Sequence, residues 1–254
     1  MTRRMSKHAV IPDTQVRPGI NLDHFTWLSN YLAEKRPDVI VHLGDHYDMP
    51  SLCVYDEDMN AVMSRRLRRD VLAGDTAFRL LTENLRHNTT YKPRLVYLLG
   101  NHEDRFNRLL AKQPNLRGAI IPPWAYPQAL GWRVIPYLQP ITIDGITYCH
   151  QFCKSSNGRV TSSKWGAPNA RAQCLRELRS CTAGHKPGLD YHMQPAGARS
   201  LHSLIVGSCY RHAEDWMTPQ GNRYWRGIIV KHEVHDGEYD IMCVSLSYLK
   251  RRYS

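Results

Sequence analysis

Polar side chains that can bind a divalent cation follow apolar runs at five places in this 254-residue chain. They are Asp13 with Gln15, Asp45 with Asp48, Asn101 with His102, His150, and His185. In an open α/β sheet, binding sites form beyond the carboxyl ends of the strands. Carboxylate, carboxamide and imidazole groups gathered there can hold two cations a few ångströms apart, an arrangement that clamps a phosphate ester. The pattern therefore predicts a chain built around a β-sheet, with a metal site at the strand ends.

Strands and helices alternate in the first half of the chain. Residues 8–11, 39–43 and 95–99 are short apolar runs, and the last two are continuous, as in strands buried on both faces. Residues 22–35 carry Leu and Phe at helical spacing and end shortly before a proline. A longer helix is predicted over residues 65–87, packed on the sheet.

The second half of the chain is richer in hairpins. Short strands are predicted at residues 133–135, 141–143, 146–149, 181–183, 200–207, 225–234 and 239–245, with a helix near 170–179. Two Asp-Gly pairs, at 144–145 and 236–237, are hairpin turn signals. We therefore predict a mixed α/β fold of α+β character, a two-sheet β-sandwich flanked by helices. No repeat or low-complexity stretch divides the chain, so residues 1–254 are expected to form a single domain.

The chain is basic. Its formal net charge is +11 and its pI is near 9.4. This balance favours polyanionic partners such as nucleic acid, although it also suits a protein that is merely soluble. No apolar run approaches the roughly 18 residues of a membrane span, and the basic N-terminal stub leads straight into a strand. We therefore expect a cytoplasmic protein without membrane contact, whose seven Cys are reduced and mostly buried.

Five segments of the chain carry a family pattern. They read PDTQ (12–15), GDHYD (44–48), GNHED (100–104), CHQF (149–152) and AGHKP (183–187). In this order they resemble the calcineurin-like metallophosphoesterases, whose pattern is D-x-H, G-D-x-x-D, G-N-H-D or G-N-H-E, a lone H, and G-H-x-H. The resemblance spans residues 7–187 and implies a four-layer fold that hydrolyses phosphate esters with a metal-bound hydroxide. The segment VHLGDHYDMPSL also looks like phosphoesterases of tailed bacteriophages, which would place the protein in a host cytoplasm.

The resemblance implies a site for two divalent metal ions. Its residues would be Asp13 and Gln15 for the first ion, Asn101, His150 and His185 for the second, and Asp45 as the bridge. Gln15 and Pro187 stand where the family has histidines of the first site. A Gln carbonyl is a neutral, hard ligand, so this site should be weak and should prefer Mn2+ or Mg2+ over Zn2+. We expect Mn2+ overall, with Mg2+, Fe2+ and Zn2+ as alternatives.

Other side chains could supply the missing imidazole's function. His46, Asp190 and His192 are the candidates, because each stands next to one of the five segments or shortly after it. The candidate ligands also have structural interpretations. An Asp after a strand can cap a helix, a Gln can occupy a turn, and a lone His can be buried and hydrogen-bonded.

His102 is the candidate general acid. It follows Asn101, and imidazole has a pKa suited to giving a proton to a leaving alkoxide. The family resemblance assigns it that role. Asp48, the last residue of G-D-x-x-D, is expected to take part by orienting a catalytic group or ligand rather than by binding metal. Glu103 and Asp104 could act likewise, although acids in the first turn of a helix need no function.

Two basic segments are candidates for substrate binding. The residues are Arg65, Arg66, Arg68 and Arg69 at the start of the long helix, and Lys154, Arg159, Lys164 and Trp165 in the polar segment 154–171. Cations are unfavourable near a helix N-terminus, and a Trp beside a site can stack on a base. Both segments could contact a phosphate backbone. A solvated helix face and a loop-anchoring Trp are the alternatives. Residues 209–225 mix basic and aromatic side chains in a similar way.

These observations favour a divalent-metal-dependent phosphoesterase whose substrate is a nucleic-acid phosphodiester, DNA or RNA. A phosphomonoesterase acting on nucleotides or phosphoproteins is one alternative. The two missing histidines leave a third possibility open, a degenerate member of the fold that binds nucleic acid or protein without catalysis. The oligomeric state is left open by the sequence.

Overall fold

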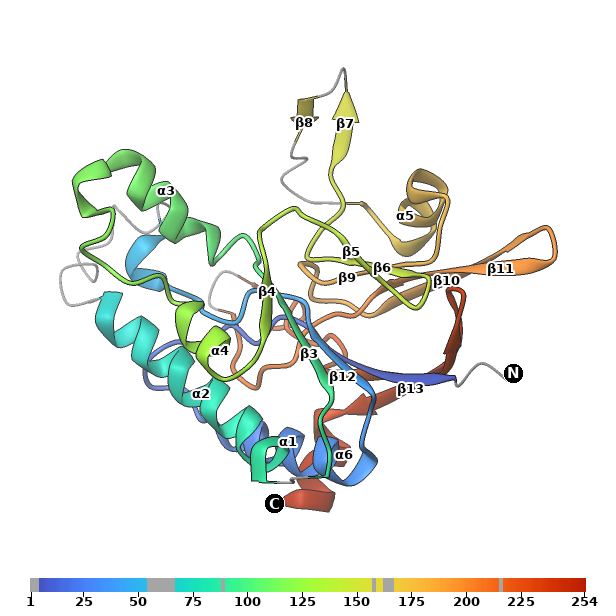
Figure 1. Ribbon diagram of the computed structural model, residues 1–254, viewed down its shortest axis with the longest axis horizontal. Coiled ribbons are helices and arrows are strands. Elements are labelled where there is room, and N and C mark those ends of the chain that lie inside the picture. Colours follow the sequence, from blue (N-terminus) through green and yellow to red (C-terminus); the bar gives the residue numbers. More distant parts are fainter. Residues whose placement is uncertain (1–4, 54–66, 88–89, 157–158, 162–166, 215–216) are drawn as a thin grey trace.

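The computed structural model describes residues 5–53, 67–87, 90–156, 159–161, 167–214 and 217–254 (Figure 1). Its described strands form two large sheets and one small hairpin. The first sheet, ordered β13-β12-β1-β2-β3-β4, contains β1 (Ser6–Ile11), β2 (Val39–His42), β3 (Arg94–Leu98), β4 (Arg133–Ile135), β12 (Gly227–His235) and β13 (Glu238–Ser245). The second, ordered β10-β11-β9-β6-β5, contains β5 (Ile141–Ile143), β6 (Ile146–Cys149), β9 (Cys181–Ala183), β10 (Asp190–Ala196) and β11 (Arg199–Ile205). The hairpin pairs β7 (Lys154–Ser156) with β8 (Arg159–Thr161).

Helices cover the outer faces of the two sheets. The described helices are α1 (Asp23–Lys35), α2 (Leu67–His87), α3 (Asp104–Lys112), α4 (Ala125–Ala129), α5 (Ala170–Glu177) and α6 (Leu246–Tyr253), with 3-10 turns η1 (Pro50–Leu52) and η4 (Pro114–Leu116). Helices α1, α2 and α6 share a core with the first sheet, and α5 packs on the second. The predicted four-layer sandwich is confirmed. None of the described helices is long and apolar enough to cross a membrane.

Alternation along the central strands builds two cores at once. Along β1, Val10 packs between the two sheets, whereas Ala9 and Ile11 pack against the helices. Along β2, Ile40 faces the helices and Val41 faces the second sheet. A strand buried on both faces appears in the sequence as a continuous apolar run rather than an alternating one. This explains why these strands are easy to recognise.

Parallel pairing carries the predicted site segments to one end of the sandwich. Strands β1, β2, β3 and β4 run parallel, and so do β6, β9 and β11. Backbone hydrogen bonds continue the pairing past the strand ends, from the Leu43 N–H to the Ile11 carbonyl (2.8 Å) and from the Gly184 N–H to the His150 carbonyl (3.0 Å). The loops that follow β1, β2, β3, β6 and β9 therefore adjoin one another.

Several elements depart from the sequence-based expectation. Strand β10 lies at the edge of its sheet with every second residue exposed, and Pro195 suits an edge because it needs no ladder partner. Helix α6 is amphipathic, with Leu246 and Leu249 buried and Ser245 accepting a hydrogen bond from the Tyr248 N–H (3.1 Å). Hairpin β7-β8 occupies part of the segment expected to be an open polar loop.

Candidate metal centre and active site

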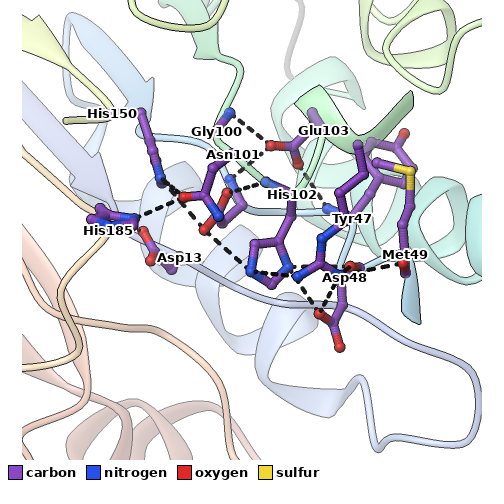
Figure 2. A network of polar contacts seen from close by, with 12 residues as sticks. Asp13, Tyr47, Asp48, Met49, Gly100, Asn101, His102, Glu103, His150 and His185 are labelled. Carbon is purple, nitrogen blue, oxygen red and sulfur yellow. Dashed lines mark hydrogen bonds and ion pairs between the residues drawn. The ribbon is translucent and has the colours of Figure 1, made fainter. Parts of the chain in front are cut away.

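Four of the predicted ligands meet at the strand ends (Figure 2). Asn101 Oδ1 lies 2.7 Å from His185 Nδ1 and 3.0 Å from His150 Nε2. Asp45 Oδ2 lies 3.4 Å from the same nitrogen of His150. One ligand atom each from Asp45, His150 and His185 lies within 4.8 Å of the others. Four loops that are far apart in the sequence thus deliver these side chains to one cluster.

His150 is held in the tautomer that a metal ligand needs. Its Nδ1 lies 2.8 Å from the carbonyl oxygen of Leu43, which can only accept a hydrogen bond, so Nδ1 carries the proton. In the neutral ring, the lone pair of Nε2 then faces the oxygens of Asn101 and Asp45. Buried electron-pair donors directed at one another call for a positive charge between them. A set of imidazole, carboxylate and carboxamide donors fits a divalent metal ion.

The electrostatics of the cluster favour a cation as well. Burial lowers the pKa of His150, but the Asp45 carboxylate outweighs it and raises the pKa to about 9. Burial raises the pKa of Asp13 to about 7, and the charge of Asp45 adds to this effect. Burial would also raise the pKa of Asp45, yet the imidazoles of His102 and His150 hold it below its usual range. Two buried carboxylates close together attract positive charge.

Two glycines make room for these carboxylates. A Cβ atom on Gly100 would overlap Asp45 Oδ1, and one on Gly184 would lie 2.6 Å from Asp13 Oδ1. If a larger residue replaced Gly100 or Gly184, the neighbouring carboxylate would have to move. The Gly of G-N-H and the Gly of G-H are therefore required by packing against the acids of other segments.

Asp13 and Gln15 adjoin the cluster. Asp13 is buried, and its Oδ1 accepts a hydrogen bond from the N–H of His185 (3.0 Å). The N–H of Gln15 donates to the carbonyl of Asp45 (2.8 Å). Gln15, Asp45 and His185 have φ angles of 39°, 47° and 67°, a left-handed conformation that is uncommon outside glycine and concentrates at functional sites. Loop 13–15 therefore lies beside the cluster of Asp45, Asn101, His150 and His185.

The three side chains considered as replacements for the missing imidazole are directed elsewhere. His46 has Nδ1 2.8 Å from Thr14 Oγ1 and Nε2 3.0 Å from the Gly74 carbonyl, inside the core under α2. A carboxylate oxygen of Asp190 accepts a hydrogen bond from the first N–H of α5. His192 lies on edge strand β10, with Nε2 3.4 Å from the side chain of a neighbouring Gln. The cluster therefore gains no ligand from these three.

His102 lies between the cluster and Asp48. Its Nδ1 is 2.9 Å from Asp48 Oδ1, and its Nε2 faces the cluster at 3.7 Å from Asp45 Oδ2. Asp48 is buried, which would raise its pKa, but the hydrogen bond with His102 lowers it. The ionised carboxylate therefore accepts a hydrogen bond from Nδ1–H and orients the ring. This is the arrangement expected of a general acid and its orienting partner.

Arg105 is a site residue that the sequence analysis missed. Its Nη1 donates to the carbonyl oxygens of Asp48 (2.7 Å) and Met49 (3.3 Å), and its Nη2 lies 3.2 Å from His102 Nε2. It lies three residues after His102, and residues at that spacing share a face at the start of a helix. That spacing was the only signal available in the sequence.

Glu103 joins the loops that carry Asp45 and Asn101. Its Oε1 accepts hydrogen bonds from the His46 N–H (2.7 Å), the Tyr47 N–H (2.9 Å) and the Tyr97 hydroxyl (2.7 Å), and its Oε2 from the Asp45 N–H (2.9 Å) and the Gly100 N–H (2.7 Å). Burial, together with the charge of Asp45, raises the pKa of Glu103. However, all five partners donate hydrogen bonds to Glu103. These contacts favour the ionised carboxylate over the protonated acid. Figure 2 shows it beside Gly100 and Tyr47, with dashed lines to both.

The predicted substrate-binding residues that the structure describes lie at the periphery. Arg68 and Arg69 are exposed in the first turn of α2. That turn adjoins η1, because both the N–H and the hydroxyl of Ser51 donate to Asp70. Lys154 and Arg159 belong to the strands β7 and β8. Arg65, Arg66, Lys164 and Trp165 lie outside the described residues.

The basic and aromatic side chains after β11 contact one another. The Arg226 guanidinium lies 4.9 Å from the ring centre of Tyr210 and 4.8 Å from that of Tyr224. Arg211 lies 5.1 Å from the ring centre of Trp27. These aromatic rings are occupied by intramolecular cation contacts. Packing therefore accounts for Tyr210, Arg211 and Tyr224 in this segment.

Metal titration is expected to show one tight site or two sites of unequal affinity. The cluster around Asn101 offers two imidazoles, whereas loop 13–15 offers none. His185→Ala should remove the tight site, while Gln15→Ala should leave the affinity of that site unchanged, because Gln15 is not among its ligands. Calorimetric titration with Mn2+ and Zn2+ measures both. Two equally tight Zn2+ sites would contradict this prediction.

Comparison with known proteins identifies a protein family that the chain matches. Residues 7–191 match a family model described as calcineurin-like phosphoesterase. No curated protein matches the chain in sequence. Among solved structures, a dimetal phosphatase from Danio rerio is 9% identical, with 96% of this chain and 100% of that chain covered and a TM-score of 0.36. Another crystal structure is 12% identical, with 95% and 100% covered and a TM-score of 0.39.

Proposed function

This chain belongs to the calcineurin-like phosphoesterase family, and from that premise we propose that it cleaves phosphodiester bonds of nucleic acid with Mn2+ as its metal. Family membership makes it a metal-dependent hydrolase of phosphoester bonds. The observation that carries the proposal is the position of His102, whose Nε2 faces the Asp45 cluster while its Nδ1 contacts Asp48. Metal ligands on one side and a general acid on the other are what ester hydrolysis requires.

The residues suited to hold metal are Asp45, Asn101, His150 and His185, with Asp13 and Gln15 at the adjoining position. Divalent ions bound there stabilise charge on phosphoryl oxygens and make a nucleophile available at neutral pH. The protein's own part is to fix the ligands. Glycines and left-handed backbone angles bring the two carboxylates close together, and the Leu43 carbonyl fixes the His150 tautomer.

His102 is suited to protonate the leaving group. Protonated at both nitrogens, it would donate Nδ1–H to Asp48 and give the Nε2 proton to the departing alkoxide oxygen. The ring then becomes neutral while Asp48 stays ionised, so the charges balance. Arg105 donates to the Asp48 carbonyl, which holds the loop that carries Asp48 against the start of α3. Its contact with Nε2 requires the unprotonated nitrogen, so that contact must open when Nε2 carries the proton.

Cationic side chains near the site support a polyanionic substrate. Arg105 and Arg108 lie on α3, and Lys186 follows β9. Arg108 Nη2 donates to the carbonyl of Asn101 (3.2 Å), which places this cation beside the cluster. Together with the net charge of +11, these residues favour a substrate with several phosphates over an isolated phosphomonoester.

A substrate comparison tests the proposal. The protein with Mn2+ should hydrolyse bis-p-nitrophenyl phosphate faster than p-nitrophenyl phosphate, and should cleave DNA or RNA oligonucleotides. Asp45→Asn should abolish all three activities. Faster hydrolysis of monoesters would favour a nucleotide or phosphoprotein phosphatase instead. Metal binding without any hydrolysis would identify a degenerate binding protein.

The arginines at the start of the long helix are expected to contribute to nucleic-acid binding. Replacing Arg65, Arg66, Arg68 and Arg69 with Gln should weaken binding similarly for all sequences. It should also flatten the plot of log affinity against log salt by about one unit for each phosphate group that the variant no longer neutralises. Rates on small aryl esters should not change, because these substrates do not reach that surface. Fluorescence anisotropy over a salt series measures the effect.

A basic patch at the other end of the fold provides the control. Lys250, Arg251 and Arg252 lie in the last turn of α6, which packs beside α1 and away from α3 (Figure 1). Changing these three to Gln removes similar charge and should alter the salt dependence much less. Unchanged binding in the arginine variant would show that the cluster is a solvated helix face.

A further inference from the structure

Asp48 is held from two sides. Its Oδ1 lies 2.9 Å from His102 Nδ1, and its Oδ2 lies 3.5 Å from Arg17 Nη1. The Asp48 side chain is 11% exposed, so few water molecules can replace either contact. Because the two carboxylate oxygens have different partners, rotation of the carboxylate would break both contacts. Arg17 therefore helps to fix the orientation of the Asp48 carboxylate. That carboxylate in turn orients the His102 ring.

Arg17 in turn meets a second carboxylate. Its Nη1 lies 3.8 Å from Glu214 Oε2, and the Glu214 side chain is 7% exposed. The other oxygen of Glu214 lies 2.9 Å from His212 Nε2, and its backbone N–H donates to Asn222 Oδ1 (2.8 Å). The ring of His212 stacks on Tyr210 with centroids 4.5 Å apart. Glu214 is thus anchored on several sides before it meets Arg17.

Glu214 is a buried carboxylate, and its burial must be compensated by other interactions. A carboxylate removed from water is costly unless cations and hydrogen bonds replace its hydration. Here the guanidinium of Arg17 and the imidazole of His212 do so. The segment that leads to Glu214 is also hydrogen-bonded to the loop that carries Asp13. The N–H of Cys209 donates to the carbonyl of Asp13 (2.8 Å). Glu214 lies beyond residue 191, where the family match ends.

We propose that Arg17 and Glu214 are positioning residues of the active site, which hold Asp48 so that His102 presents Nε2 to the substrate. This inference rests on the proposed phosphoesterase function. Without Arg17, the Asp48 carboxylate can turn toward Arg105, whose Nη1 already lies 3.9 Å from Oδ1. His102 Nδ1 then keeps only the main-chain carbonyl of Asp48 (3.1 Å) as an acceptor, so its proton is held less firmly. A segment outside the family-matched region thereby completes the general-acid pair.

Kinetics with two kinds of leaving group test the proposal. Arg17→Gln and Glu214→Gln should each lower kcat about tenfold on a dialkyl-type diester such as a dinucleotide, with KM within about twofold, because small misplacements of a catalytic group lower turnover. Bis-p-nitrophenyl phosphate, whose leaving group needs little protonation, should be hydrolysed as before. Arg17→Lys should recover part of the loss, since it keeps the charge. Equal losses on both substrates would overturn the proposal.

A matched variant and a mutant cycle sharpen the test. Arg211→Gln alters a neighbouring arginine that contacts Asn21 and Asp23 instead, and should leave both rates unchanged. In the His102→Ala background, Arg17→Gln should have no further effect, because it acts through His102. A further tenfold loss in that background would show that Arg17 acts elsewhere.

A spectroscopic measurement separates this inference from the proposed function. Nitrogen-15 NMR of the metal-free protein should show the wild-type His102 ring protonated at Nδ1 when neutral, and a mixture of tautomers in Arg17→Gln and Glu214→Gln. This result requires no hydrolysis. If the tautomer is unchanged in both variants, the positioning role is wrong. If the tautomer changes but the wild type hydrolyses no phosphoester, the proposed function fails instead.

Discussion

Replacing His102 with Ala is expected to lower turnover of phosphodiesters with poor leaving groups by roughly 100-fold or more, the contribution of a positioned general acid. The effect should be much smaller for activated aryl esters, because their leaving groups depart without a proton. The reason lies in the geometry, since His102 Nε2 faces the Asp45 cluster while Nδ1 is committed to Asp48. Steady-state kinetics on a dinucleotide and on bis-p-nitrophenyl phosphate measure the difference.

Two control measurements test this interpretation of His102 as the general acid. Metal content, measured by elemental analysis, should be the same in His102→Ala and in the wild type. His192→Ala, on edge strand β10 and outside the cluster, should leave both rates unchanged. A loss of metal in His102→Ala, or an equal loss of rate on both substrates, would reassign His102 to a ligand or structural role.

Replacing Glu103 with Gln is expected to destabilise the fold by about 3–5 kcal/mol, because each buried donor left without an acceptor costs about 1–3 kcal/mol. The carboxylate accepts five hydrogen bonds, and all five partners are donors. An amide keeps one acceptor oxygen and turns an NH2 group toward N–H donors, so at least two bonds become unfavourable contacts. Urea unfolding measures the change.

The same variant should weaken metal binding roughly 10- to 100-fold, as loss of an outer-shell partner does. Glu103 holds the backbone of both Asp45 and Gly100, which precedes Asn101, so both ligand loops loosen together. Asp104→Asn is the matched control. Within the described part of the chain, the Asp104 side chain contacts Asn107 and Arg108 at the surface, and its replacement should change stability by less than about 0.5 kcal/mol. Similar losses in the two variants would refute the anchoring role of Glu103.

Local patterns in the sequence determine where the site-bearing strands end. The strands predicted at 133–135, 141–143, 146–149 and 181–183 have the bounds that the structure shows. Each is a short apolar run with turn or polar residues directly at its ends, and such runs are visible without knowledge of their neighbours. The edge strand β10 was missed because its exposed side has no apolar pattern of its own.

The meeting of Asp45, Asn101, His150 and His185 was also open to prediction. All four follow strands, and parallel strands deliver their carboxyl ends to one edge of the fold. The order of the five segments added a family pattern, which the family match bears out. Sequence alone therefore identified the class of site and the segments that build it.

Only the tertiary structure decided which polar groups act on one another. Glu103 meets the N–H of Asp45 across 58 positions of sequence, and Arg17 meets Glu214 from the other end of the chain. Neither spacing nor composition records such contacts, because they depend on sheet order, loop conformation and side-chain rotamers. His46 illustrates the point. It follows Asp45 directly, yet the left-handed turn at Asp45 sends its ring into the helix-side core and leaves the carboxylate in the cluster.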